Sequence, residues 1–239
     1  MQTFKTRGVI IGATENGESD KRLVVLCKGH GRVQIHARGA RKPKSKFMAT
    51  AQLFTYADML IADGRSFKSL AQAEVIESFY ALRTDYERLC TAHLIAEICE
   101  KTVLEDQPCD DLLLLVLRAF SYLKIEHPPL LVLCTFLFRF YSCQGLTPQV
   151  DECVICGTPL DLAANFNAEG FLCRTHTHTG SIMPLSPASV QAIRHVLHSE
   201  LRTAFAFTAH ASVLRELSIA ARFLWEHHFG WKLKSEAFL

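Results

Sequence analysis

Four residues in the second half of the chain have the spacing of metal ligands. Cys153, Cys156, Cys173 and His176 follow the pattern C-x2-C-x16-C-x2-H. Thiolates and imidazoles are common ligands of structural zinc, and two such pairs about 15–20 residues apart are typical of a zinc ribbon. We therefore predict one structural Zn²⁺ per chain, bound by these four residues. His178 is an alternative fourth ligand, and the motif could also be redox-active or a remnant that no longer binds metal.

The same cluster lacks the features of a catalytic metal site. A catalytic zinc keeps an open coordination position and usually has a general base nearby, but the chain has no HExxH motif and no P-C-x-x-C motif. A segment with P-loop-like spacing carries Glu18 where the phosphate-binding lysine would stand. No G-x-S-x-G or G-x-G-x-x-G motif occurs either. We expect a protein without catalytic residues, which is not an enzyme.

A strongly basic segment lies in the first fifth of the chain. Residues 1–50 hold 11 Lys and Arg against 3 Asp and Glu, whereas the net charge of the whole chain is only +2. Such a charge density repels itself unless a polyanion neutralises it, and phosphate backbones are the usual partner. The predicted nucleic-acid contacts are Lys28, Arg32, Arg38, Arg41, Lys42, Lys44 and Lys46. The alternative is a solvated loop that only keeps an edge strand soluble.

Two further groups of side chains are candidates for binding. Phe47, Phe54 and Tyr56 follow the basic loop and could stack on bases, although Phe54 would equally suit a core. Arg118 and Arg139 each interrupt a strongly apolar run. They could line an apolar pocket for an acidic peptide that ends in a hydrophobic residue, or else snorkel or form ion pairs.

The basic segment falls in a β-rich region. Short runs of β-type residues separated by turn-type clusters predict five strands, at residues 8–13, 22–27, 32–37, 53–62 and 66–76. Five strands in fewer than eighty residues suit a small closed barrel. The oligonucleotide-binding (OB) barrel is the common version, and an SH3-like barrel is the alternative.

The remaining part of the chain has helical periodicity, which the cysteine cluster interrupts. Helices are predicted at residues 82–103, 109–126, 128–145, 186–200 and 211–230. The expected fold is α+β, with an N-terminal five-stranded OB barrel and a helical domain that contains an inserted zinc-ribbon-like module. The expected divisions are 1–79 for the barrel, 80–148 and 183–239 for the helical domain, and 149–182 for the module.

Composition and apolar patterning indicate the cellular compartment. The segment MQTFKTRGVIIG is too short and polar for a secretory signal, and the apolar runs at 112–117 and 130–138 are too short to span a bilayer. Most of the nine cysteines stand singly in apolar segments, which is typical of reduced structural thiols. We expect a cytoplasmic protein.

Two sequence patterns carry a resemblance to a known family. Gly39-Ala40-Arg41-Lys42-x-Lys44-Ser45 follows the third predicted strand, and Leu82-Arg83-x-Asp85-x-x-Arg88 opens the first predicted helix. In this order, and with the cysteine ribbon between helices, the whole chain resembles the RecO family of bacterial recombination mediators. The chain differs from the family in having His176 where a fourth cysteine is usual.

The resemblance implies a DNA-binding protein of recombinational repair, associated with the bacterial nucleoid. Proteins of this family bind single- and double-stranded DNA, anneal complementary strands and act with RecR. They also contact the acidic C-terminal tail of single-stranded DNA-binding protein, and so help to load RecA. A zinc-stabilised adaptor that binds RNA or an acidic protein is the alternative function that we considered.

Overall fold

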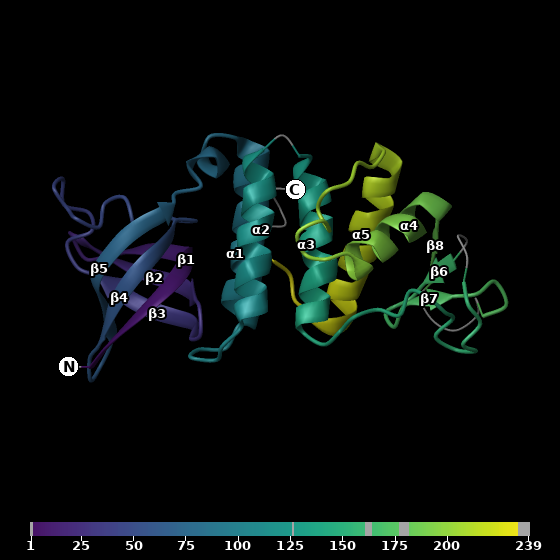
Figure 1. Cartoon of the computed structure of the whole chain (residues 1–239), viewed down its shortest axis with the longest axis horizontal. Helices are drawn as coiled ribbons and strands as arrows, with labels where there is room; N and C mark the ends of the chain where they lie inside the picture. Colours follow the sequence, from purple (N-terminus) through teal and green to yellow (C-terminus); the bar gives the residue numbers. More distant parts are fainter. Residues whose placement is uncertain (1, 126, 161–163, 177–181, 234–239) are drawn as a thin grey trace. The chain divides into compact units, whose positions relative to one another are not determined.

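A computed structural model of the chain describes residues 2–125, 127–160, 164–176 and 182–233. The chain forms two compact units, one of residues Met1–Ile125 with Leu233–Leu239 and one of Glu126–Lys232. The structure is α+β, with the five strands of the N-terminal sheet followed by helices (Figure 1). This part of the predicted fold class is confirmed.

The first unit begins with a closed barrel. Its strands are β1 (Gln2–Asn16), β2 (Asp20–Cys27), β3 (Gly31–Ala37), β4 (Tyr56–Asp63) and β5 (Lys68–Glu77), in the order β1-β2-β3-β5-β4. The barrel closes because β1 is long enough to pair with β4 through its first half and with β2 through its second half. All neighbouring strands are antiparallel except β3 and β5, which pair only at Ile35 with Lys68 and His36 with Ser69.

The alternating residues of these strands explain the barrel core. In β3, Val33, Ile35 and Ala37 are buried, while the polar residues between them are exposed or half-buried. The apolar side chains on the inner face of β2 join the same cluster. A period of two places every second residue on one face of a strand, so this pattern fixes the register of the sheet.

Two helices complete the first unit. After a short 3-10 turn at Tyr80–Arg83 come α1 (Tyr86–Thr102) and α2 (Asp110–Lys124). Asp85 caps α1, because its carboxylate accepts a hydrogen bond from the Arg88 amide at 2.9 Å. Phe54 joins these helices to the barrel, since it is fully buried with its ring centroid 5.2 Å from that of Phe120.

The burial of two predicted stacking residues excludes them as base platforms. Phe54 is fully buried and Phe47 is 4% exposed. The core alternative for Phe54 is therefore confirmed, and stacking by Phe47 is a wrong prediction. A ring can bind a base only through an accessible face, and both rings instead contribute to the apolar interior.

The second unit consists of three helices and a small sheet. The helices are α3 (Pro129–Cys143), α4 (Pro187–His198) and α5 (Ala211–His228), and the strands β6 (Ala164–Phe166), β7 (Phe171–Leu172) and β8 (Met183–Leu185) have the order β7-β6-β8. α3, α4 and α5 contact one another. The buried Tyr141 hydroxyl of α3 donates a 2.7 Å hydrogen bond to the Ala221 carbonyl of α5. None of the helices in the described ranges is both long and apolar enough to cross a membrane.

Candidate functional site

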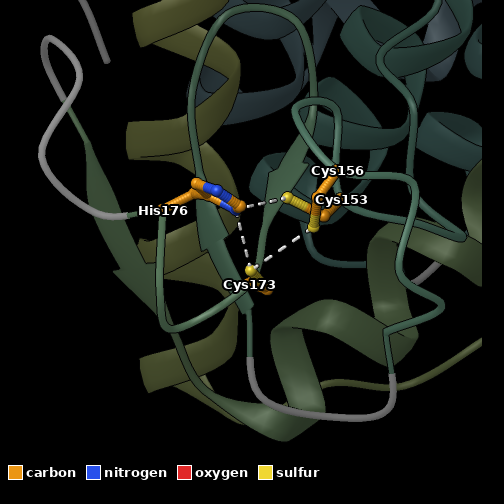
Figure 2. A group of neighbouring side chains, drawn as sticks. All are labelled: Cys153, Cys156, Cys173 and His176. Atoms are coloured by element: carbon orange, nitrogen blue, oxygen red, sulfur yellow. Dashed lines mark hydrogen bonds between the residues drawn. The ribbon is translucent and has the colours of Figure 1, made fainter.

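The four predicted metal ligands lie together in the second unit. Cys153, Cys156, Cys173 and His176 each offer one ligand atom, and these atoms all lie within 4.8 Å of one another. Figure 2 shows the three sulfurs and the imidazole pointing toward a common centre. The alternative ligand His178 lies outside the described residues. The local geometry therefore supports the prediction that these four residues could hold a metal ion.

The spacing of the ligand atoms fits a tetrahedral zinc ion. Bonds of about 2.3 Å to sulfur and about 2.0–2.1 Å to nitrogen put two sulfurs about 3.8 Å apart, and sulfur and nitrogen about 3.6 Å apart. Cys156 Sγ and Cys173 Sγ are 3.9 Å apart, and His176 Nδ1 is 3.7 Å from Cys153 Sγ and 3.2 Å from Cys173 Sγ. Four protein ligands complete a tetrahedron, as in structural sites.

The turn after the first cysteine favours the thiolate form. Gly157 has φ +66° and donates its amide to the Cys153 carbonyl at 2.9 Å, which closes the knuckle. Burial by itself would raise the pKa of the Cys153 thiol, but hydrogen bonds with backbone groups of Cys173, Cys156 and Ile155 lower this pKa to about 6. Because metals bind the thiolate, this environment prepares Cys153 as a ligand.

Two hydroxyls near the cluster escaped the sequence prediction. The Thr158 hydroxyl is 3.2 Å from Cys156 Sγ, and the Thr175 hydroxyl is 2.9 Å from Cys173 Sγ. Each threonine stands two residues after its cysteine, and this offset is the only signal that the sequence offers. Such groups around a metal site orient its ligands and tune their basicity.

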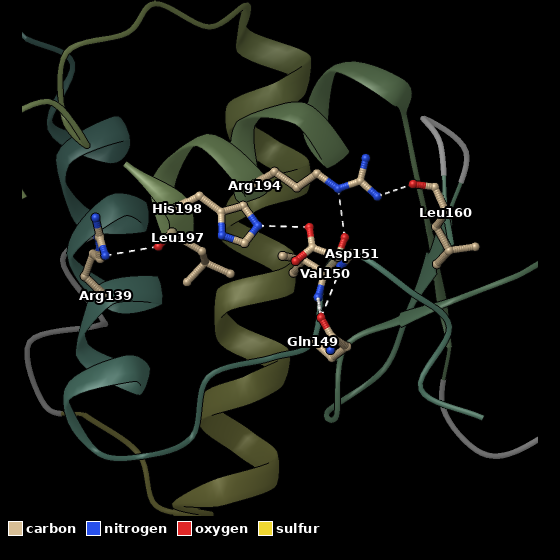
Figure 3. A network of polar contacts seen from close by, with 8 residues as sticks. All are labelled: Arg139, Gln149, Val150, Asp151, Leu160, Arg194, Leu197 and His198. Carbon is tan, nitrogen blue, oxygen red and sulfur yellow. Dashed lines mark hydrogen bonds and ion pairs between the residues drawn. The ribbon is translucent and has the colours of Figure 1, made fainter. Parts of the chain in front are cut away.

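Helix α4 holds the ribbon segment, which we define as residues 149–182. Arg194 Nε donates to the Val150 carbonyl at 2.8 Å, and Arg194 Nη2 donates to the Leu160 carbonyl. One turn further along, His198 Nε2 is 3.0 Å from Asp151 Oδ1. Figure 3 shows both side chains reaching from α4 to the ribbon segment. The position of the metal ligands thus depends on α4 as well as on the knuckles.

Arg139, one of the two arginines predicted to line a peptide pocket, forms hydrogen bonds to the end of α4. Its guanidinium, on α3, donates to the Leu197 carbonyl near the C-terminal end of α4 (Figure 3). It also donates to the carbonyl of Ser199, the residue after the helix. A cation at this position satisfies carbonyls that lack a partner within the helix and complements the helix dipole. Arg118, on α2 of the other unit, is half-buried and has no ion pair or hydrogen bond within the described part of the chain. A peptide-binding role of either arginine stays a prediction.

The basic loop, defined as residues 38–47, is fastened to the barrel by several contacts. Arg41 Nη2 forms an ion pair with Glu15 at 3.1 Å, and the Arg41 amide donates to the Ser19 carbonyl at 2.9 Å. Asp20 accepts the Gly39 amide at 2.7 Å, and this hydrogen bond lowers the pKa of the Asp20 carboxyl. The loop is therefore an ordered turn against the β1–β2 connection.

The predicted cations differ in how free they are to bind an anion. Lys42 and Lys44 are exposed, and neither side chain has a hydrogen bond or ion pair in the described ranges. Lys28 is likewise exposed.

Two other predicted cations already have partners. The Arg32 Nε donates to the Val103 carbonyl at 2.8 Å, and its Nη1 lies 3.3 Å from Glu105. Lys46 donates to the Ala71 carbonyl at 2.9 Å. Nucleic-acid binding by the seven residues stays a prediction, best supported for Lys42, Lys44 and Lys28.

One aromatic residue beside the basic loop was missed by the sequence analysis. Phe67, in the turn between β4 and β5, is 43% exposed. The Arg38 guanidinium lies 5.4 Å from the centre of its ring, and the His36 ring lies 4.7 Å away. Phe67 stands in a polar turn, where no periodicity separates an exposed ring from a buried one. The spatial cluster of cations and rings is visible only in the folded chain.

These features define a class of protein: a closed five-stranded barrel with a basic loop, followed by a helical unit with four residues that could hold a metal ion. Family models described as "Recombination protein O N terminal" and "Recombination protein O C terminal" match residues 1–79 and 83–237. The chain belongs to the RecO family. The resemblance inferred from the two sequence patterns is confirmed.

Curated relatives cover nearly the full length of the chain. A protein of Acetivibrio thermocellus is 32% identical over 231 residues, which span 95% of this chain and 92% of the relative. One from Desulfitobacterium hafniense is 33% identical over 208 residues, or 84% of this chain and 76% of the relative. One from Bacillus pumilus is 27% identical over 238 residues, or 99% and 93%. All three are named DNA repair protein RecO.

Proposed function

We propose that this protein is a non-enzymatic DNA-binding protein of recombinational DNA repair. It binds single- and double-stranded DNA, anneals complementary strands and, with RecR, helps to load RecA onto DNA coated by single-stranded DNA-binding protein. Family membership supports the repair role. The observation that carries DNA binding is the pair Lys42 and Lys44, which are exposed and whose side chains form no hydrogen bond or ion pair in the described structure, although Lys42 is attracted by the Asp20 carboxylate. Free cations on an ordered loop neutralise phosphates with little reorganisation.

The barrel is proposed to be of the OB type. Its closed order β1-β2-β3-β5-β4 and the parallel pairing of β3 with β5 support this assignment. A barrel of this type commonly binds oligonucleotides through its strand face and its loops. The basic loop between β3 and β4 and the turn between β4 and β5 would then provide the contacts. The proposed location of the protein is the bacterial cytoplasm, at the nucleoid.

The second unit is proposed to bind one zinc ion, which has a structural role. Cys153, Cys156, Cys173 and His176 would hold the ion, because the separations of their ligand atoms match tetrahedral geometry. When bound, zinc would cross-link the two knuckles of the ribbon segment. With no open coordination position among four protein ligands, the site suits stability and not catalysis. This argument supports the proposal that the protein has no enzymatic activity.

The DNA-binding proposal is tested by removing the two free lysines of the basic loop. Lys42→Ala together with Lys44→Ala should weaken binding of the full-length protein to single-stranded DNA. The slope of log K against log salt should become shallower by about 0.7 for each lost phosphate contact. ATP-independent annealing of complementary oligonucleotides should slow in parallel.

A matched control removes the same charge elsewhere. Arg215 on α5 and Lys232 are both exposed, and neither side chain has a partner in the described structure. Arg215→Ala together with Lys232→Ala should leave the salt slope and the annealing rate near those of the wild type. If the loop variant keeps the wild-type salt slope, the basic loop does not bind DNA. If the wild type binds RNA or an acidic protein but does not anneal DNA, the adaptor function replaces the mediator function.

A further inference from the structure

Phe67 forms the wall between two neighbouring hollows on the barrel. One hollow of about 510 Å³ is lined by residues of β2, β3 and the α1–α2 loop, and the other, of about 290 Å³, lies toward Arg38 and Leu70. Phe67 lines both, together with Gly64, Arg65 and Ser66 of the same turn. The larger volume lies in the range of about 300–1,000 Å³ that is usual for small-ligand sites. The Arg38 guanidinium lies over this ring and the His36 ring packs beside it, so the ring offers a ligand the surface that these two side chains leave exposed.

The charges around this ring are arranged unevenly. Arg22, Arg38 and Arg65 are exposed and form no ion pair in the described ranges of the chain. Arg22 lies directly across from His36 in the β2–β3 pairing, so it belongs to the same face as the ring cluster. The Arg38 guanidinium lies over the Phe67 ring and is attracted by the Asp20 carboxylate, but it forms no ion pair. Guanidinium groups without an ion pair beside an aromatic ring suit a ligand that combines phosphates with a flat ring system.

Two other cations that line the larger hollow already form ion pairs. There, Arg32 lies 3.3 Å from Glu105, and Lys68 lies 2.9 Å from Asp106. Asp63 also lines this hollow, and it lies across from Lys68 in the β4–β5 pairing. The arginines near the ring that form no ion pair are therefore Arg22, Arg38 and Arg65, of which Arg38 is attracted by the Asp20 carboxylate. These arginines are the groups that phosphates of a bound strand would contact.

We propose that Phe67 is a stacking platform for one unpaired base of a single-stranded nucleic acid, whose flanking phosphates contact Arg38 and Arg65. This inference rests on the proposed DNA-binding function and adds a site to it. A base in a duplex is stacked on both faces and paired at its edge, so it has no face to offer to Phe67. The platform would therefore favour single strands, whereas the lysines of the basic loop contact both forms of DNA through phosphates.

The test compares Phe67→Ala and Phe67→Leu with the wild type, using the full chain and an oligo-dT probe. Base–aromatic stacking contributes about 1–3 kcal/mol per base, which corresponds to a loss of about 5- to 150-fold in affinity. Both variants should bind single strands at least about fivefold more weakly, with an unchanged salt slope and unchanged duplex affinity. Phe67→Leu keeps an apolar side chain of similar size, so its loss of affinity would be due to the missing π-face. Because Phe67 is 43% exposed in a turn, both variants should fold.

A second variant makes stacking directly visible. Phe67→Trp should retain the affinity for oligo-dT, and its fluorescence should be quenched on binding after subtraction of the signal of Trp225 and Trp231. An oligonucleotide in which every residue is abasic should abolish the difference between the wild type and Phe67→Ala. Wild-type affinity of Phe67→Ala for oligo-dT would overturn the platform while leaving the proposed function standing. An equal loss for duplex and single strand would also overturn it. A wild-type protein that binds no DNA would overturn both proposals.

Discussion

Replacing Arg194 by methionine tests whether α4 holds the ribbon segment. The guanidinium donates to two carbonyls on different parts of that segment, those of Val150 and Leu160. It also lies 5.7 Å from the centre of the Phe171 ring. Methionine keeps an unbranched apolar stem but removes the charge and all donors. Any loss of stability therefore reports on the contacts of the charged group, which include the one with the Phe171 ring.

The size of the effect follows from the two hydrogen bonds. A hydrogen bond to a charged group contributes about 1.5–3 kcal/mol, and a half-buried position places each bond near the lower end of this range. The expected decrease in the free energy of unfolding is about 2–4 kcal/mol. Arg194→Lys should lose part of this amount, because an ammonium group lacks the planar fork that reaches both carbonyls.

The chain provides its own probe for this measurement. Both tryptophans, Trp225 and Trp231, lie in the second unit, and Trp225 Nε1 donates to the Trp231 carbonyl at 2.9 Å. Tryptophan fluorescence in urea therefore reports on the unit that contains the substitution. Arg215→Met on α5 is the matched control, with an expected change of less than about 0.5 kcal/mol. A change of this small size for Arg194→Met, or an equal loss for the control, would refute the role of Arg194.

Three other predictions concern the metal site, a close approach and a titration. Chelation should release about one zinc per chain and lower the temperature of unfolding; an unchanged melting curve after loss of the metal would contradict a structural role. Gly31→Ala should destabilise the barrel strongly in thermal unfolding, because at φ +65° its Cβ would collide with the Gln107 carbonyl oxygen; wild-type stability would show that this approach is not tight. The pKa of Asp20 lies below its usual 3.8, since the Gly39 amide stabilises the carboxylate. This stabilisation is complete above the usual pKa and is lost as the pH falls through the lower folded value. The NMR shift of that amide should titrate with a midpoint below 3.8, and a higher midpoint would argue against the contact.

The local patterns of the sequence predicted most of the fold. The five predicted strands and five predicted helices occur where alternation and helical periodicity placed them, whereas the short strands β6, β7 and β8 were not predicted. The ends of some elements differ from the predicted ends. β1 starts at Gln2, six residues before its predicted start, because its exposed first half pairs with β4. The predicted fourth strand began at Leu53, but Phe54 has φ 70° and the strand starts at Tyr56. The pairing of β1 with the distant β4 and the buried turn at Phe54 leave no periodic pattern in the sequence.

The site was predicted where its residues lie close in the sequence. The metal ligands follow a spacing pattern, so their cluster could be read directly. The contacts of Arg32 with Glu105 and of Arg139 with the end of α4 join segments far apart in the chain. Composition shows that cations are present but not which of them are already paired. Phe67 was missed because its contacts with His36 and Arg38 also join residues that are far apart in the sequence.

The contact of Lys46 with Ala71 has a consequence for the solubility of the protein. Beyond Ser69, β5 pairs with β4 alone within the described structure, so its other edge carries backbone groups available to a strand from another molecule. Lys46 places an ammonium group on this edge, 2.9 Å from the Ala71 carbonyl. A charge in this position disfavours edge-to-edge joining of sheets. We therefore expect Lys46, a residue of the basic loop, to oppose self-association through this edge.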